Sequence, residues 1–329
     1  MLRRERLRWQ FRAIRKMSQL TNVTNNTQQI RGNDILSFST LRNERVRLPF
    51  FLDYYRKMGV RHFFMVDNGS DDGGREYLAT QPDVSLWTTL ANYKDAAFGV
   101  DWLNGLKMRF AHNHWVLVVD VDEFLVYPHC DTRPMPALVD WMDANGYQSF
   151  GAMMIDMYGK GKITDSVYQE GEDPIETLPW FDAGNYYYSF NPWHRNLWIQ
   201  GGPRMREFFA DDPLSAPALN KTPLVKWKRG NVYISSTHSL LPRSLNQIYD
   251  SNGGERTTGC LLHAKFLSVF ADKAKEEIAR GQHYANSREY MAYQASTEAD
   301  KVLWTPNSTK YEGWQQLESL GLISTGGWL

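Results

Sequence analysis

Three carboxylates follow an apolar run in the middle of the chain, and their spacing suggests chemistry. Residues 115–119 are apolar without interruption, as expected of a strand that is buried on both faces of a parallel sheet. Asp120 and Asp122 come next with one residue between them, and Glu123 follows. In an open α/β sheet, ligands bind beyond the carboxyl ends of the central strands. Acids crowded there repel one another and resist desolvation, so we expect a positive charge between them.

A hard divalent cation with oxygen ligands is the candidate for that charge, and it would in turn hold a phosphate-bearing substrate. The alternative is that the acids line a solvated turn or cap the helix expected after Pro134. Short acidic triplets are common in loops. The functional interpretation therefore depends on the apolar strand before the acids and on the pattern upstream.

Composition excludes several classes of protein. The chain has 329 residues with 42% hydrophobic and 22% charged residues, which is typical of globular rather than disordered proteins. Its formal net charge is zero, which argues against a dedicated nucleic-acid-binding protein. Cys130 and Cys260 form neither a disulfide framework nor a zinc motif, and they fit a reducing compartment. Because the sequence has no membrane-spanning run and no signal-peptide core, we expect a cytoplasmic protein.

The N-terminal segment differs in charge from the rest. Residues 1–20 indicate a basic helix that could lie on an anionic membrane, at its inner face, or could simply be a frayed or packed terminal helix. The following residues are rich in Asn, Thr and Gln and indicate a linker. We therefore divide the chain into a basic segment with its linker (1–33), a main domain (34–270) and a C-terminal helical tail (271–329).

Strands and helices alternate through the first half of the main domain. Strands are predicted at 35–39, 62–66, 84–87 and 115–119, with helices between them at about 48–58, 75–79 and 95–110. This alternation predicts an α/β fold with a Rossmann-like, mostly parallel sheet flanked by helices. Beyond a strand expected at 151–157, roughly 60 residues are dense in Trp, Tyr, Pro and Gly, which is typical of a functional surface.

Three polar segments follow predicted strands in order along the chain. Residues 41–44 read LRNE, residues 67–73 read DNGSDDG, and residues 120–124 read DVDEF. Together they resemble a family 2-type glycosyltransferase with the GT-A fold, and more narrowly the bacterial branch whose metal motif continues as DxDEF. The resemblance covers roughly residues 34–267. The order of the three segments is much more specific than any one motif.

The resemblance implies a transferase that moves a sugar from a nucleotide-diphosphate donor, usually a UDP-sugar, to a glycan or other hydroxyl acceptor, as in polysaccharide biosynthesis. Asn43 and Glu44, with Arg42 beside them, would lie at the nucleotide pocket. Asp67 would accept a hydrogen bond from the base. The alternative for these residues is turn and cap chemistry, which the same residue types also serve.

The same resemblance implies a metal site with Mn²⁺ or Mg²⁺. Asp120 would contact the sugar or ribose and lie beside the metal, and Asp122 would bind the metal under the diphosphate. The metal would neutralise the diphosphate as it leaves. Charge stabilisation of this kind is usually the largest catalytic contribution.

Two histidines are candidates for completing the metal site, as a later histidine often does in GT-A enzymes. They are His238 in the segment STHS and His263 in the segment LHAKF. We prefer His263 because Lys265, two residues on, would share its face in a strand and could meet a phosphate. The alternative is a structural role, which is the commoner one for a lone histidine.

The resemblance also implies an inverting enzyme, in which an Asp or Glu deprotonates the acceptor hydroxyl. By its position in the segment GGPRMRE, Glu207 is our candidate for this base, with Asp156 as the alternative. Glu207 could equally form an ion pair with Arg204 or Arg206. The commonest family pattern places the base in a Glu-Asp pair, which this segment lacks.

Aromatic residues in the later segment could stack on sugar rings and form an acceptor-side region, or most of them could fill the core. They are Trp180, Tyr186, Tyr187, Tyr188, Trp193 and Trp198.

Two other classes of protein stay open. A non-catalytic nucleotide-sugar or glycan-binding protein would keep the pocket without turnover. A haloacid dehalogenase-type phosphatase also carries DxD after a strand, but after its first strand, whereas here three predicted strands come before the strand that carries the motif. The expected partners are a nucleotide sugar and a glycan acceptor but no nucleic acid, with peripheral membrane contact through the basic segment.

Overall fold

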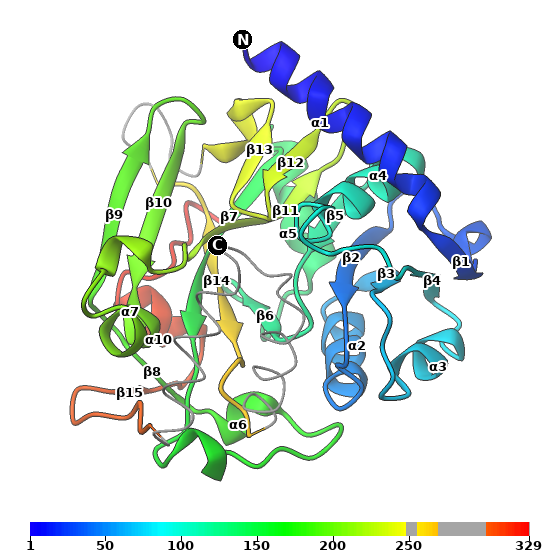
Figure 1. Cartoon of the computed structure of the whole chain (residues 1–329). Helices are drawn as coiled ribbons and strands as arrows, with labels where there is room; N and C mark the ends of the chain where they lie inside the picture. Colours follow the sequence, from blue (N-terminus) through cyan, green and yellow to red (C-terminus); the bar gives the residue numbers. More distant parts are fainter. Residues whose placement is uncertain (248–254, 269–300, 329) are drawn as a thin grey trace.

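One nine-stranded sheet runs through the protein, whose computed structural model describes residues 1–247, 255–268 and 301–328 (Figure 1). The strand order is β1-β4-β3-β2-β5-β11-β7-β14-β6. These strands are β1 (Thr21–Thr24), β2 (Ile35–Leu41), β3 (Val60–Asp67), β4 (Val84–Thr88), β5 (Trp115–Val118), β6 (Glu123–Val126), β7 (Ser149–Asp156), β11 (Asn220–Lys226) and β14 (Thr258–His263).

Helices and three small strand pairs surround the sheet. The α-helices are α1 (Leu2–Lys16), α2 (Leu48–Lys57), α3 (Gly74–Ala79), α4 (Val100–Phe110), α5 (Met135–Ala144), α6 (Pro174–Thr177), α7 (Gly202–Phe208) and α10 (Trp314–Ser319). The small pairs are β9 (Tyr186–Asn191) with β10 (Asn196–Gly201), β12 (Val232–Ser235) with β13 (Ser239–Leu241), and β8 (Trp180–Phe181) with β15 (Thr309–Lys310).

The α/β, Rossmann-like architecture predicted from the sequence is confirmed. Strands β4, β3, β2 and β5 are parallel neighbours, as the alternation of strands and helices predicted. The other half of the sheet is mixed, because β11 runs antiparallel to both β5 and β7, and β14 is parallel to β7 but antiparallel to β6. Neither β11 nor β6 was predicted from the sequence.

Alternating side chains give the sheet two apolar faces. In β2, Ile35 and Leu41 lie in one cluster of buried residues, and Leu36 and Phe38 lie in another. Helices α2, α3, α5 and α10 contribute to the first cluster, whereas α4 contributes to the second. Each fully buried large side chain stabilises the fold by about 1.5–3 kcal/mol. The sheet is thus enclosed on both sides, and its strand ends remain the place for a site.

Strand β11 lies in the centre of the sheet despite its proline. Proline lacks an N–H group, so it normally argues against a central strand. Here Pro223 falls where the register between β11 and β7 shifts, between Lys221 and Leu224. The missing donor therefore coincides with an irregularity in the ladder. This local exception is why the sequence did not reveal the strand.

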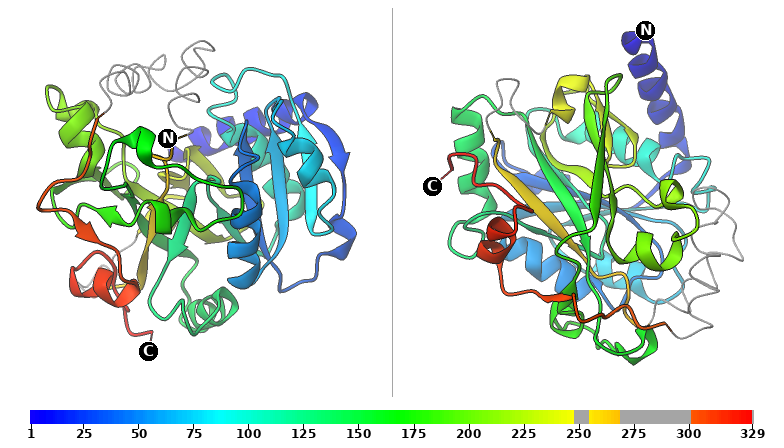
Figure 2. Two further views of the ribbon diagram at one scale, coloured as in Figure 1. Left: turned by 90° about the horizontal axis from the view of Figure 1, so that it is seen from below. Right: turned by 90° about the vertical axis from the view of Figure 1, so that its left-hand side faces the viewer.

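The N-terminal segment packs onto the main fold. Helix α1 lies along α4, where Arg12 pairs with the buried Asp101 at 2.8 Å, and its N-terminal end projects from the protein (Figure 2). A side chain at Gly105 would collide with Met17, so this glycine permits the close approach. Strand β1 then pairs with β4, within the stretch for which the sequence indicated a linker. Among the described residues, no helix has both the length and the apolar character needed to cross a membrane.

The C-terminal residues also contact the main fold. Residues 271–300 of the expected helical tail lie outside the described residues. Within 301–328, Trp314, Leu317 and Trp328 belong to the larger apolar cluster.

Two tyrosines of α2 hold the strand that follows the acidic motif. The Tyr55 hydroxyl donates to the Glu123 carbonyl at 2.7 Å and accepts from the Leu125 N–H at 3.1 Å. The Tyr54 hydroxyl donates to the Leu125 carbonyl at 2.8 Å. These bonds fix β6, and with it the acidic residues that precede it.

We predict that Tyr55→Phe lowers the free energy of unfolding by about 1–3 kcal/mol, because it leaves two buried backbone groups of β6 without that partner. Tyr54→Phe is the matched control and should cost less, because it removes a single, partly buried hydrogen bond. Chemical denaturation of the three proteins measures the difference. A Tyr55→Phe protein as stable as the wild type would contradict this role.

Candidate functional site

The acidic segment crosses the ends of three strands. Strands β5 and β6 are not neighbours, since β11, β7 and β14 lie between them in the sheet. Residues 119–122 connect β5 to β6, with a turn in which the Glu123 N–H donates to the Asp120 carbonyl at 3.1 Å. The Ala264 N–H, just beyond β14, donates to the Asp122 carbonyl at 2.8 Å. Each of the three intervening strands has one end near the acids, where β11 begins and β7 and β14 end, and each supplies a polar side chain.

Strand β11 supplies a buried lysine. The Lys221 Nζ lies 2.9 Å from Glu123 Oε1 and 3.9 Å from Asp120 Oδ2. Lys221 and Glu123 are both almost fully buried, whereas the Asp120 side chain is 57% exposed. Burial lowers the pKa of Lys221, but Glu123 and Asp120 outweigh it and raise the pKa above its usual value. The positive charge expected among the acids is thus provided in part by the protein itself.

Strands β7 and β14 supply a second set of charges. His263 Nδ1 lies 2.6 Å from Asp156 Oδ1, and His263 Nε2 lies 3.4 Å from Asp122 Oδ2. Arg204 of α7 donates through Nε to Asp156 Oδ2 at 2.7 Å. The four side chains form a chain from Arg204 through Asp156 and His263 to Asp122. Its members alternate between cationic and anionic groups.

Charge neighbours shift the pKa values of this chain in opposite directions. Burial raises the pKa of Asp156, but Arg204 and His263 outweigh it and lower the pKa to about 2. Burial also raises the pKa of Asp122, and His263 outweighs it, so the pKa of Asp122 falls below its usual range. Burial lowers the pKa of His263, and the flanking carboxylates leave it above its usual value. All three shifts favour the charged forms.

Asp120 differs from the other acids. Desolvation at the strand end and the negative charge of Glu123 raise the pKa of Asp120 to about 7, against the lowering effect of Lys221. Because more than half of the Asp120 side chain is exposed, we regard repulsion by Glu123 as the main cause. Asp120 is the most exposed of the three acids in this segment.

Asp122 and His263 are donors that suit a divalent cation. Their facing atoms, Oδ2 and Nε2, belong to the ligand types that Mn²⁺ accepts. Asp156 bonds the other ring nitrogen, as the outer partner of a metal-bound histidine commonly does. Within the described ranges, however, no three His, Cys, Asp or Glu side chains are grouped so that they could hold a metal. An ion here would need further ligands from substrate or water.

The residues predicted at the nucleotide pocket connect the loops after β2 and β3. Arg42 donates to the carbonyls of Asn68 and Gly69. Asn43 has a positive φ of 51° and accepts from the Asp71 N–H at 3.0 Å. These contacts are turn chemistry, and they place the two loops side by side.

Glu44 and Asp67 are buried under the loops after β2 and β3. Glu44 forms a buried ion pair with Arg47 at 2.6 Å. Asp67 is fully buried and accepts hydrogen bonds from the Ser70 N–H and the Thr88 hydroxyl. Both side chains therefore support the loops in this structure.

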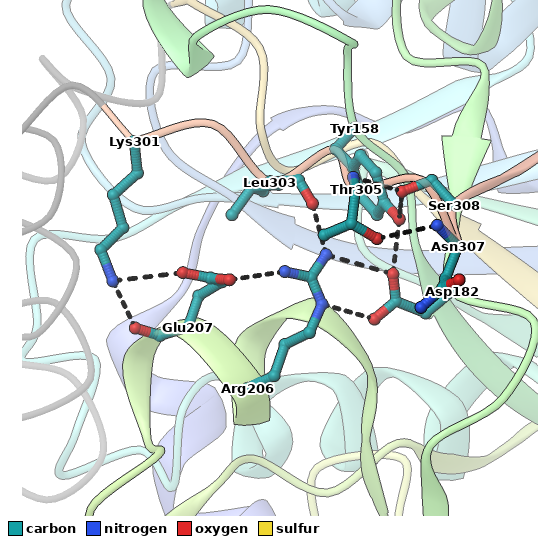
Figure 3. A network of polar contacts seen from close by, with 9 residues as sticks. All are labelled: Tyr158, Asp182, Arg206, Glu207, Lys301, Leu303, Thr305, Asn307 and Ser308. Carbon is teal, nitrogen blue, oxygen red and sulfur yellow. Dashed lines mark hydrogen bonds and ion pairs between the residues drawn. The ribbon is translucent and has the colours of Figure 1, made fainter.

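Glu207 lies in a network that binds the C-terminal segment to α7 (Figure 3). Its carboxylate pairs with Arg206 at 2.6 Å and with Lys301 at 3.5 Å. Arg206 also pairs with Asp182 at 2.8 Å and donates to the Leu303 carbonyl. Of the ion pairs considered from the sequence, the one with Arg206 is present. The two candidate bases thus have different surroundings, since Asp156 belongs to the chain of charges that ends at Asp122.

The remaining candidates lie as follows. His238, between β12 and β13, pairs through Nδ1 with the Asn220 carbonyl at 2.6 Å. Lys265 follows β14 and is half-buried, and its charge contributes to the lowered pKa of Asp122. Of the two histidines, His263 is thus the one that the fold places beside Asp122.

The aromatic segment divides between the core and the surface. Tyr187, Tyr188 and Trp193 are exposed, on β9 and the turn after it. Trp180, Tyr186 and Trp198 are half-buried.

The sequence did not reveal the roles of Lys221 and Arg204. Lys221 lies in β11, which the sequence did not predict because Pro223 interrupts its pattern. Arg204 was noted as an ion-pair partner for Glu207, but it pairs with Asp156 instead. The signal that could have found both is an excess of acids at one strand end, which requires cations from elsewhere in the chain.

Comparison with known proteins gives a partial likeness. No family model matches the chain. Its sequence is similar to a glycosyltransferase family 92 protein of Oryza sativa subsp. japonica, with 31% identity over 96 residues, which is 27% of this chain and 15% of that relative. A structure of a protein assigned as a glucose-1-phosphate thymidylyltransferase from Bacillus anthracis, in complex with a sucrose, aligns with 88% of this chain and 95% of its own. Its sequence identity to this chain is 9%, and the TM-score of the superposition is 0.30.

We predict that Lys221→Met lowers the free energy of unfolding by about 3–5 kcal/mol, because Glu123 is left buried without its cation. The second substitution Glu123→Gln should restore much of this loss. Lys226→Met on the same strand is the control and should cost about 1 kcal/mol or less, since its pair with Asp143 is more exposed. Chemical denaturation tests all four proteins, and equal losses in the two lysine variants would contradict the assignment.

Proposed function

We propose that the protein is a metal-dependent glycosyltransferase. It transfers a sugar from a nucleotide-diphosphate donor, with UDP-sugars as the first candidates, to a hydroxyl of a glycan or similar acceptor. One observation carries the proposal. Asp122 and His263 lie beside each other at the strand ends, and Asp156 pairs with the other ring nitrogen of His263. The similarity to a glycosyltransferase family 92 protein supports the same class of reaction. The finer likeness to family 2, carried by the DVDEF segment, is part of the proposal.

Asp122 and His263 would hold Mn²⁺ or Mg²⁺, and the ion would supply positive charge to the departing diphosphate. Asp156 accepts from His263 Nδ1 and so keeps Nε2 directed toward Asp122. Asp120, which is exposed, would contact the sugar or ribose of the donor. Lys265 would meet a phosphate from the end of β14.

The loops after β2 and β3 would form the nucleotide pocket. Arg42 and Asn43 join these loops, and Glu44 and Asp67 support them from below. The exposed tyrosines of β9 offer flat apolar faces to the acceptor. We also propose that the protein is located in the cytoplasm.

Of the two candidate bases, we retain Glu207. Asp156 is almost fully buried, and its pKa of about 2 suits a permanent charge rather than a group that accepts a proton near neutral pH. Glu207 keeps 28% of its side chain exposed. It would deprotonate the acceptor hydroxyl in an inverting reaction.

The first test is the release of free nucleotide from a panel of nucleotide sugars, with Mn²⁺ or with chelator. We expect metal-dependent release from one donor, reduced by on the order of 10²-fold or more in Asp122→Asn and His263→Gln, because each removes charge stabilisation of the leaving group. Lys226→Met is the control and should release nucleotide at the wild-type rate.

Two other results would argue against a glycosyltransferase. Nucleotide binding without release from any donor, with acceptor glycans present, would favour the non-catalytic binding protein. Failure to bind any nucleotide in calorimetry would refute the glycosyltransferase proposal.

We predict that Glu207→Gln lowers turnover by roughly 10²–10⁴-fold while donor binding is unchanged, because it removes the proton acceptor and keeps the shape. Asp182→Asn is the matched control, since it weakens the same network at Arg206 but leaves Glu207 in place. If both variants lose turnover equally, Glu207 acts through the network and not as the base.

A further inference from the structure

Helix α1 carries three bulky apolar residues on the side that faces solvent. Leu7, Phe11 and Ile14 are 53%, 65% and 59% exposed, and their spacing places them on one face of the helix. A surface helix normally turns such residues toward the core. These three residues of α1 therefore do not contribute to packing on the fold.

The inner side of α1 is held by both polar and apolar contacts. Arg12 pairs with Asp101, and Gln10 donates to the Gly230 carbonyl at 3.0 Å. Glu5 lies 3.5 Å from His194. Ala13 is buried, and Trp9 packs against β12 and β13. Because these contacts fix the rotation of the helix, the apolar stripe stays outside.

Positive charge surrounds the apolar stripe. The exposed charged residues of α1 are all basic, namely Arg3, Arg4, Arg8 and Arg15. Glu5 is the acid of this helix, and it lies on the inner side beside His194. The solvent-facing surface of α1 thus combines bulky apolar groups with arginines.

The turn between β9 and β10 extends this surface. It touches α1 through the Glu5–His194 contact, and both project at the same end of the protein in Figure 1 and in the right view of Figure 2. Phe190 and Trp193, before and within the turn, are 59% and 45% exposed. Exposed aromatic residues of this kind are typical of the interface between membrane and water.

We propose that the outer face of α1, with the adjoining β9–β10 turn, docks on an anionic lipid bilayer. Leu7, Phe11 and Ile14 enter the boundary between headgroups and acyl chains, and the arginines contact the lipid phosphates. A second copy of the chain fits less well, because a two-fold interface through this face would bring like charges together. The inference is independent of the proposed enzymatic activity.

Co-sedimentation with vesicles tests the proposal. The full chain is mixed with vesicles of phosphatidylcholine alone or of phosphatidylcholine with phosphatidylglycerol. We expect sedimentation with the anionic vesicles, weakened by added salt. The variant Leu7→Gln/Phe11→Gln/Ile14→Gln should lose it, and each Arg→Gln change at positions 4, 8 and 15 should weaken binding by roughly fivefold.

Matched controls distinguish docking from unfolding and from non-specific hydrophobic adsorption to vesicles. Leu90→Gln/Leu214→Gln removes two apolar residues elsewhere that are even more exposed and should bind as the wild type does. Circular dichroism checks that every variant is folded. In addition, Phe11→Trp should show a blue shift of its fluorescence when anionic vesicles are added.

Several results would overturn the proposal. They are no sedimentation of the wild type with anionic vesicles, equal binding to both kinds of vesicle, and unchanged binding by the apolar variant. A wild-type dimer in light scattering that the apolar variant abolishes would show that the face belongs to a protein interface instead.

Discussion

The need to compensate buried carboxylates shapes the carboxyl end of the central sheet. Glu123 and Asp156 are almost fully buried, and an isolated ion there would cost several kcal/mol. Lys221 of β11 and Arg204 of α7 provide the compensating charges. These cations come from parts of the chain that follow the acids by some 50 to 100 residues, so the acids are paired only through the tertiary fold. The same contacts that permit burial therefore also assemble the site.

The sequence predicted the parallel half of the sheet and the place of the acids, because both depend on local patterns. An apolar run followed by Asp120 and Asp122 marks a strand end regardless of what packs beside it. The mixed half was not predictable in this way. Strand β11 is interrupted by Pro223, and its partners are far away in the chain. The preference for His263 over His238 assumed that Lys265 shares a strand with His263, which is wrong because β14 ends at His263, but the fold does place His263 beside Asp122. The contact between Lys221 and Glu123 has no signature in local sequence.

Helix α7 connects the site to the C-terminal segment. Arg204 and Arg206 point in different directions from this short helix, since one reaches Asp156 and the other reaches Asp182 and Glu207. The first belongs to the chain of charges that ends at Asp122. The second is bound to the Leu303 carbonyl, beyond the residues that the structure leaves undescribed. The C-terminal segment and the acids are thus both in contact with α7.

The tyrosines of α2 have a consequence for how copies of the chain meet. Strand β6 is the last of the sheet, and an open edge strand is a template on which another chain can add itself. The hydroxyls of Tyr54 and Tyr55 form hydrogen bonds with backbone groups of Glu123 and Leu125 that face away from β14. At the opposite edge, β1 has only four residues and an irregular register. Both borders of the sheet are therefore poor starting points for aggregation by strand addition, although its centre is long and apolar.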